Sequence, residues 1–216
     1  DLPFAEGYVL PIDKPLGWTS SDVVRKIKVM MRRLGHRKIK VGHAGTLDPL
    51  ATGILIVCLG RATKQAEALQ AQPKEYLTTL ALGATTPSFD MEHPVDRTFP
   101  YEHITQQMLE EALRTMEGEQ MQLPPVYSAK SIDGKRAYEY ARQGTEVEMR
   151  RAPVTVYGMR LESFEPPRAT LRIRCSKGTY IRSIARDLGE KLGSGAYLTA
   201  LCRTRSGDFT LEDAYT

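Results

Sequence analysis

Apolar residues recur at helical spacing in several stretches of this sequence, and each stretch predicts an amphipathic helix. The first begins at Thr19-Ser20-Ser21-Asp22, which is a typical helix-start signal. Its apolar stripe consists of Val23, Val24, Ile27, Met30, Met31 and Leu34. Further helices are predicted over residues 62–71, 104–116, 135–142 and 179–192.

Continuous or alternating apolar residues predict strands over residues 54–59, 76–82, 154–164 and 169–175. Pro166-Pro167 predicts a turn between the last two strands. Residues 35–53 are expected to form a long loop, and long loops in compact domains are often functional. Strands do not alternate strictly with helices, which favours an α+β fold over a doubly wound sheet. With no break in composition, we expect one catalytic domain over residues 1–216.

Composition excludes several classes of protein. The apolar fraction of 41% is ordinary for a globular chain. The longest apolar run, Ile54–Leu59, is too short to cross a bilayer, and no signal peptide is recognisable. The three cysteines are widely spaced, which argues against disulfides or a zinc site and for a reducing, cytoplasmic location.

Charge is segregated along the chain, so the net charge of +4 is a poor guide to the surface. Eight cations and no acid lie between Val23 and Leu47, and a second basic region extends from Arg168 to Arg205. The acids gather between Asp90 and Glu119. Two basic regions indicate a polyanionic partner such as nucleic acid, whereas most single charge runs are only solvated helix faces.

The segment Gly42–Gly53 places one carboxylate, Asp48, among glycines, small residues and a proline. Glycines allow close approach of a large ligand, and Pro49 restricts Asp48 to extended or turn geometry. Asp48 is therefore a candidate nucleophile or base. The alternative is that it only caps a turn, as Asp before Pro often does.

Three other residues have both a functional and a structural interpretation. Arg182 is expected in the first turn of its helix, where the helix dipole disfavours a cation unless a carboxylate pairs with it. Tyr76 is either a core residue or a stacking platform for a base. His43 is a free loop histidine, a nucleic-acid contact or, least expected, a metal ligand, because no cysteine or acid stands at ligand spacing.

Four motifs in order resemble the TruB family of bacterial tRNA pseudouridine synthases, which modify the TΨC-loop uridine at position 55 of tRNA. The motifs cover nearly the whole chain. They are Lys14–Ser20, Gly42–Gly53, Pro124–Lys130 with Gly134–Tyr138, and Lys177–Arg182 with Leu198 and Arg203–Gly207.

The resemblance implies a role for each matching residue. Asp48 is the catalytic aspartate, Tyr76 stacks on the flipped uracil, and Arg182 pairs with Asp48. Substrate binding is implied for His43 against the T loop, Leu201 in an apolar wall, Tyr180 and Lys14. The implied pseudouridine synthase fold is a mixed, largely antiparallel central sheet flanked by helices and loops.

The implied reaction breaks the N1–C1′ bond of uridine, turns the uracil and joins C5 to C1′. Because no atom is gained or lost, we expect no cofactor and no metal, in line with the lack of a dinucleotide motif or P-loop. One carboxylate is enough because the uracil stays in the pocket, and Asp48 acts as a nucleophile or removes a sugar proton. The target base must be flipped out of the RNA.

The implied partner is the T-stem-loop of tRNA. We expect the protein to be a monomer that needs no obligatory protein partner and does not associate with a membrane. Many relatives carry a small C-terminal RNA-binding (PUA) domain, which we do not expect in this sequence. Three alternatives remain: a non-catalytic RNA-binding or tRNA-folding protein, the same chemistry on another RNA, and a small-molecule enzyme that cradles a phosphate. The acid within the loop disfavours the last.

Overall fold

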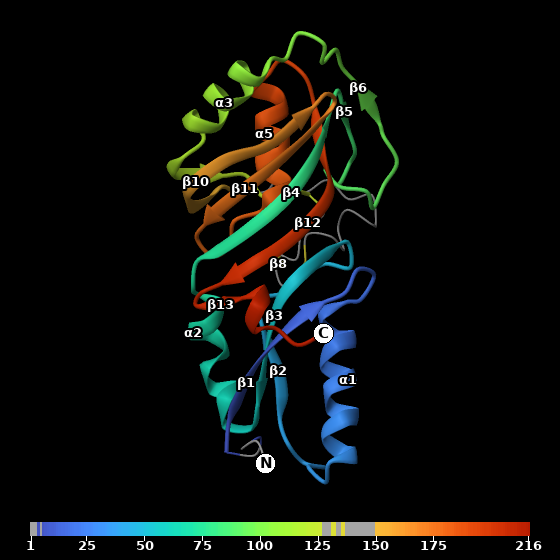
Figure 1. The fold of residues 1–216 in the computed structure, drawn as a ribbon, viewed down its shortest axis with the longest axis vertical. Coiled ribbons are helices and arrows are strands. Elements are labelled where there is room, and N and C mark those ends of the chain that lie inside the picture. The colour runs from blue at the N-terminus through green and yellow to red at the C-terminus, as the bar shows by residue number, and fades with distance from the viewer. Residues whose placement is uncertain (1–3, 5, 127–130, 133–134, 137–149) are drawn as a thin grey trace. The chain divides into compact units, whose positions relative to one another are not determined.

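The computed structural model describes residues 4, 6–126, 131–132, 135–136 and 150–216, which form two compact units (Figure 1). Unit 1 comprises Asp1–Leu77 and Leu201–Thr216, and unit 2 comprises Thr78–Ala200. The boundary falls within two strands, β4 (Lys74–Leu82) and β12 (Ala196–Ser206). The prediction that residues 1–216 form one catalytic domain is a statement about activity, and it stays a prediction.

Unit 1 is built around strand β3 (Ala51–Leu59). Strands β1 (Tyr8–Lys14) and β2 (Val41–Ala44) pair with it in antiparallel fashion, and the C-terminal part of β12 pairs in parallel. The short strand β13 (Phe209–Thr210) pairs with β12 and leads into the 3₁₀ helix η2 (Leu211–Asp213).

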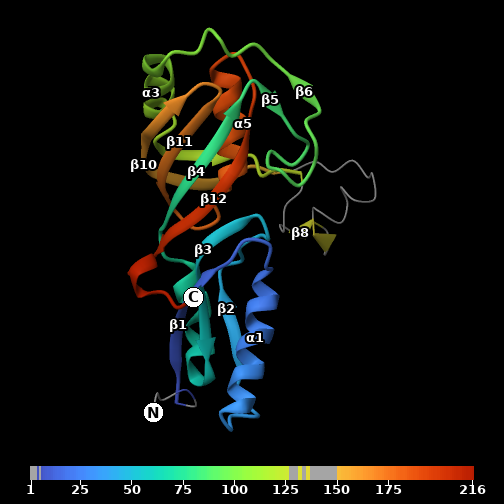
Figure 2. The ribbon, with the colours of Figure 1, turned by 45° about the vertical axis from the view of Figure 1, so that its right-hand side comes forward.

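Strand β3 is apolar at nearly every position because both of its faces are covered. Leu55, Val57 and Leu59 belong to one cluster with Val23 and Ile27 of α1 (Ser20–Arg33), the helix that stands beside β2 in Figure 2. The alternate residues face the 3₁₀ helix η1 (Gly60–Gln65) and α2 (Ala66–Gln70), and are Ile54, Ile56 and Cys58. Burial on two faces explains the unbroken apolar run.

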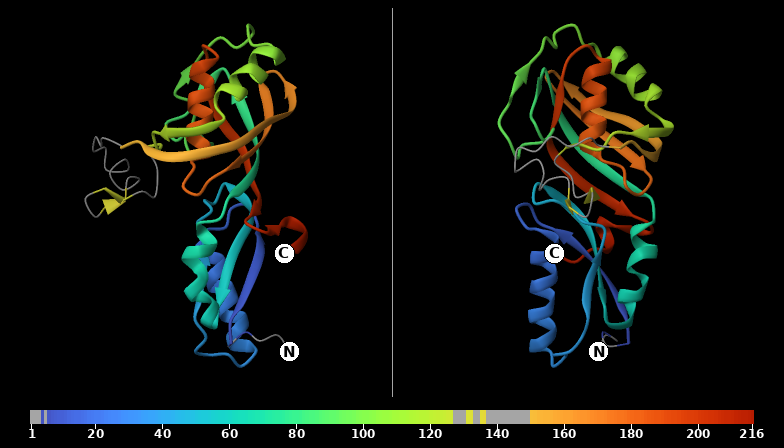
Figure 3. Two further views of the ribbon diagram at one scale, coloured as in Figure 1. Left: turned by 90° about the vertical axis from the view of Figure 1, so that its left-hand side faces the viewer. Right: turned by 180° about the vertical axis from the view of Figure 1, so that it is seen from behind.

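Unit 2 contains a sheet in the order β12-β4-β11-β10-β7. The strands not yet defined are β11 (Arg168–Cys175), β10 (Ala152–Glu165) and β7 (Gly118–Gln122). Helices α3 (Gln106–Thr115) and α5 (Ile181–Lys191) lie on one face of this sheet (Figure 3). Two small hairpins complete the described elements, β5 (Ala84–Thr85) with β6 (Arg97–Thr98) and β8 (Ser131–Ile132) with β9 (Lys135–Arg136).

The α+β class and the largely antiparallel pairing are confirmed, and so are the helices near residues 20–33, 106–115 and 181–191. No described helix is long and apolar enough to cross a membrane. The long loop over residues 35–53 is wrong in part, since it contains β2 and the start of β3. The glycines in this segment interrupt the apolar pattern that predicts strands. Both strands form by pairing with residues outside the segment.

The predicted helix over residues 135–142 is wrong at its start, because Lys135–Arg136 form strand β9. The remainder of that prediction, and much of the third motif, lie outside the described residues. Between α1 and β4, the predicted helix over residues 62–71 is divided into η1 and α2.

Candidate active site

The loop that carries Asp48 is anchored through its backbone, while the Asp48 side chain is exposed. Ser20, the first residue of α1, both accepts from the Leu47 N–H (2.9 Å) and donates to the Leu47 carbonyl (3.0 Å). The Gly17 N–H donates to the Pro49 carbonyl (2.8 Å). These bonds fix the main chain just before and just after Asp48, so its exposed carboxylate extends from a fixed main chain.

Arg203 of β12 supplies a third anchor. Its buried guanidinium donates from Nε to the Ile54 carbonyl (2.8 Å) and from Nη2 to the Gly45 carbonyl (2.9 Å). Gly53 leaves the space that this strand crossing needs, since a Cβ there would lie 2.2 Å from the Arg203 carbonyl oxygen. The φ of Gly53 is +102°, which also favours glycine.

Lys14 is fully buried at the end of β1, within the first motif. Its ammonium donates to the carbonyls of Pro15 (3.0 Å) and Trp18 (2.6 Å). Burial lowers the pKa of Lys14, while the negative charges of Asp48 and Asp22 oppose that shift. The buried cation therefore holds the turn after β1 and lies within the electrostatic reach of Asp48.

His43 lies in β2 rather than in a loop, opposite Val57 of β3. Its Nδ1 is buried without a hydrogen-bond partner among the described residues. Burial and the nearby Arg203 guanidinium lower the pKa of His43, so the ring is neutral at pH 7. No group of three or more His, Cys, Asp or Glu side chains arranged for a metal ion occurs in the described part of the chain.

Leu201 and Tyr76 belong to the same unit as Asp48. Leu201 pairs with Ala51, only three residues beyond Asp48. Tyr76 is buried in β4, the neighbour of β12, where Thr204 Oγ1 donates to the Glu75 carbonyl (3.3 Å). The strand order thus sets Tyr76 two strands from β3, roughly 10 Å at ordinary strand spacing.

Arg182 and Tyr180 belong to unit 2. As predicted, Arg182 lies in the first turn of α5; it is 9% exposed and its guanidinium donates to the Ser88 carbonyl (3.4 Å). No carboxylate among the described residues forms an ion pair with it. Tyr180 is the N-cap, and its N–H donates to Gln122 Oε1 (2.8 Å). The pairing of Arg182 with Asp48 stays a prediction.

The second basic region is not uniformly exposed. Arg203 is buried, and Arg172 and Arg186 form ion pairs with Glu162 and Asp187. By contrast, all eight cations of the first region are exposed; they are Arg25, Lys26, Lys28, Arg32, Arg33, Arg37, Lys38 and Lys40. The anchoring role of Arg203 was missed because a basic residue in a basic run resembles a phosphate contact.

Comparison with known proteins places these residues in a family. A family profile described as TruB family pseudouridylate synthase (N-terminal domain) matches residues 32–181. A second, described as tRNA pseudouridylate synthase B C-terminal domain, matches residues 182–216. The chain is 56% identical over 213 residues to tRNA pseudouridine synthase B of Phocaeicola vulgatus, covering 98% of this chain and 91% of the relative.

A further relative is tRNA pseudouridine synthase B of Bacteroides fragilis, 54% identical over 212 residues, with 98% and 91% of the two chains covered. Among solved structures, a Cbf5-Nop10-Gar1 complex matches with a TM-score of 0.72 and 30% identity over 96% of this chain. The chain spans 50% of that solved chain. This protein belongs to the TruB family of pseudouridylate synthases.

Proposed function

We propose that this protein is a tRNA pseudouridine synthase that isomerises the T-loop uridine. The observation that carries the proposal is the exposed Asp48 on a loop whose backbone is held by Ser20, Arg203 and Gly17. A reactive carboxylate needs this combination of a fixed main chain and an accessible side chain. Relatives that are more than half identical to this chain are named tRNA pseudouridine synthase B.

The proposed reaction needs one carboxylate. Asp48 attacks a carbon of the substrate, or removes a proton from the sugar, so that the N1–C1′ bond breaks. The detached uracil, which leaves with the electron pair on N1, turns within the pocket. C5 then bonds to C1′, and in the same stage either the bond between Asp48 and the substrate breaks or the abstracted proton returns to the sugar. The C5 hydrogen leaves as a proton and N1 gains one. The proposal gives Tyr76 the stacking contact with the uracil, Arg182 the role of countercharge, and Leu201 the apolar wall.

The proposed partner is the T-stem-loop of tRNA. Exposed cations of unit 1 support this proposal: a hollow of about 680 Å³ is lined by Arg37, Lys38, Lys40, Arg61 and Lys64. None of these five forms an ion pair with a described residue. The hollow adjoins the C-terminal end of β3, about 25 Å along the strand from the Asp48 end. Backbone phosphates suit such a cluster.

We further propose that residues 1–216 act as one catalytic domain, that the protein works as a monomer without an obligatory protein partner, and that it is cytoplasmic. The three cysteines, Cys58, Cys175 and Cys202, are not joined by disulfides, which suits a reducing compartment.

Tritium release from tRNA transcripts labelled at uracil C5 tests the reaction, because joining C5 to the sugar expels that hydrogen. We expect release by the wild type and none by Asp48→Asn, with the dissociation constant for tRNA within a few-fold of the wild type. Asp208→Asn, another exposed aspartate of unit 1, is the matched control and should remain active. Changing the T-loop uridine to cytidine should abolish release.

Two results would contradict the proposal. Tight, salt-sensitive binding of tRNA without release from any transcript would favour a non-catalytic RNA-binding or tRNA-folding protein. Release from another RNA, but not from tRNA, would assign the same chemistry to a different substrate.

A further inference from the structure

Trp18 stands exposed beside the Asp48 loop. It is the only tryptophan of the chain, and 38% of its surface is accessible. The apolar side chains of Leu16 and Leu50, 64% and 39% exposed, come from the same turn and from the Asp48 loop. Large exposed apolar side chains that gather near a catalytic loop indicate a binding surface.

The indole of Trp18 is attached to a main chain that hydrogen bonds hold in place. The Trp18 carbonyl accepts from buried Lys14, and the next residue, Thr19, is the N-cap of α1, where its hydroxyl accepts from the Asp22 N–H (2.9 Å). The preceding Gly17 is bonded to Pro49, next to Asp48. The main chain that carries Trp18 is therefore fixed before any ligand binds, which lowers the entropic cost of binding.

The indole has unused binding capacity. None of the described residues stacks on its ring or accepts a hydrogen bond from its N–H. Because the ring is flat and polarisable, its open face suits another planar π system.

The surroundings of the ring suit a nucleotide rather than an apolar peptide. A hollow of about 420 Å³ is lined by Gly17, Trp18, Asp22, Arg25, Lys26 and Val29. The Asp22 carboxylate is already bonded to the Thr19 N–H (2.9 Å) and to Arg25. Lys26 has no ion-pair partner among the described residues, so a net positive charge faces the hollow.

We propose that Trp18 is a stacking platform for a base of the RNA that neighbours the target uridine, with Lys26 at the adjoining phosphate. This inference rests on the proposed function, which makes RNA the substrate. An aromatic ring beside a cation is the usual means of holding an unpaired base without reading its sequence. The base held by Trp18 would be kept away from Asp48 while the uridine is exposed to it.

The emission of this single tryptophan reports the contact directly. We expect titration with a T-arm hairpin to quench Trp18 fluorescence, because a stacked base quenches an indole. Hairpins with one abasic nucleotide, placed in turn at each loop position, should restore emission at one position next to the target and not elsewhere. Unchanged emission at saturating hairpin would overturn the proposal.

Variants provide a second readout. Trp18→Ala should raise the dissociation constant for the hairpin on the order of tenfold, whereas Trp18→Phe, which keeps a ring, should raise it less. Leu16→Ala separates stacking from a general apolar contact: it removes a neighbouring exposed apolar side chain without a ring and should cost less affinity than Trp18→Ala.

The outcomes separate the two proposals. Tritium release by the wild type, together with Trp18→Ala that binds like the wild type, would overturn the stacking role and leave the function intact. Quenching and loss of affinity without tritium release would support the RNA contact and contradict the synthase. Equal losses in Leu16→Ala and Trp18→Ala would show a general apolar contact and overturn the stacking role.

Discussion

The Arg203 guanidinium stabilises the Asp48 loop from inside the protein, by donating to the carbonyls of Gly45, just after β2, and of Ile54 in β3. A guanidinium with two carbonyl partners is hard to replace, because its planar fork donates from two separate nitrogens, Nε and Nη2, whereas lysine has a single nitrogen. The position of Asp48 thus depends on a residue 155 positions later in the sequence.

Arg203→Lys should lower the free energy of unfolding by about 2 kcal/mol, since one carbonyl loses a charged donor. The single-turnover rate should fall roughly tenfold, because the loop loses part of its support. Denaturant unfolding and tritium release measure the two effects. The matched control is Arg205→Lys, an exposed arginine of the same strand, and equal effects in both variants would contradict the anchoring role.

His43 gives a pH dependence with a defined sign. Its pKa is lowered in the folded protein, so the unfolded chain binds more protons below about pH 6.5. Stability is therefore full above that pH and declines as the pH falls toward the lowered pKa. His43→Gln should weaken this decline in thermal unfolding measured from pH 7 to 5. An unchanged pH profile would show that other groups cause it.

At the scale of elements, the crossing of β3 and β12 is the point least tolerant of change. Gly53→Ala places a methyl group on the Arg203 backbone at a residue with positive φ, so we expect a loss of more than about 3 kcal/mol of stability or failure to fold. Gly42→Ala in β2 meets nothing within 4 Å and is the control. Both are measured by chemical denaturation.

The sequence predicted the elements whose burial leaves a periodic signal. Helix α1 was predicted because its cap and stripe are local, and the core of β3 because six apolar residues follow one another. Strand β2 was not predicted, since Val41–Ala44 is short and contains a glycine and a histidine. Strand β12 was also missed, because its buried positions, such as Arg203, are not all apolar.

The same limit applies to the candidate site. Asp48 was found because its loop has a distinctive composition and resembles a family motif. The anchors from Ser20 and Arg203 could not be found from the sequence. Ser20 is 27 positions from Leu47, and Arg203 is 158 positions from Gly45. Such pairings depend on tertiary structure and leave no periodic pattern in the sequence.

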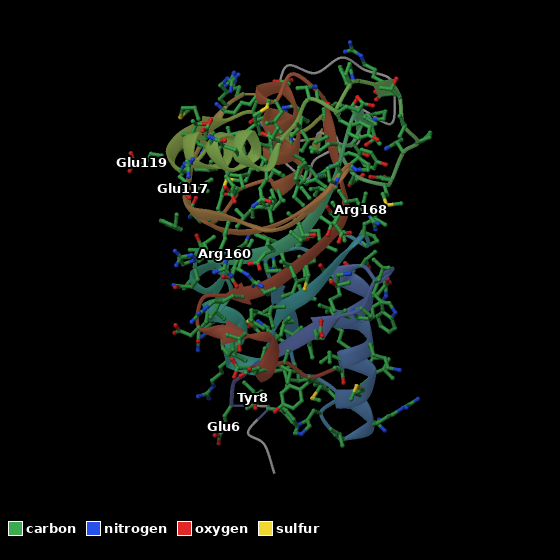
Figure 4. All side chains as sticks on the ribbon, turned by 45° about the horizontal axis from the view of Figure 1, so that its top comes forward. Glu6, Tyr8, Glu117, Glu119, Arg160 and Arg168 are labelled. Atoms are coloured by element: carbon green, nitrogen blue, oxygen red, sulfur yellow. The ribbon has the colours of Figure 1, made fainter. Side chains whose placement is uncertain are left out.

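At the scale of the whole molecule, unit 1 has a surface of exposed cations, and unit 2 has exposed cations such as Arg168, Arg174 and Lys177 together with an acidic surface. Exposed cations cover α1 and the turn before β2 in unit 1. Unit 2 has an acidic hollow, lined by Glu117, Glu119, Asp187 and Glu190, and Figure 4 shows the first two together at one edge. A polyanion is attracted to the first surface and repelled by the second.

Binding of tRNA should therefore weaken steeply as salt rises. Lys38→Gln should reduce the slope of log affinity against log salt by roughly 0.7 to 0.9 if it contacts one phosphate. Lys191→Gln, an exposed lysine that lines the acidic hollow of unit 2, should leave the slope unchanged. Equal slopes for Lys38→Gln and the wild type would remove Lys38 from the interface.

The hydrogen bonds that anchor the Asp48 loop act on main-chain atoms: the N–H and carbonyl of Leu47 and the carbonyls of Gly45 and Pro49. The path of the loop is thus largely independent of the side chains it displays. Exposed positions such as Thr46 and Leu50 are open to variation without displacing the aspartate. This is a favourable starting point for directed evolution, in which RNA preference could be altered while the chemistry is inherited unchanged.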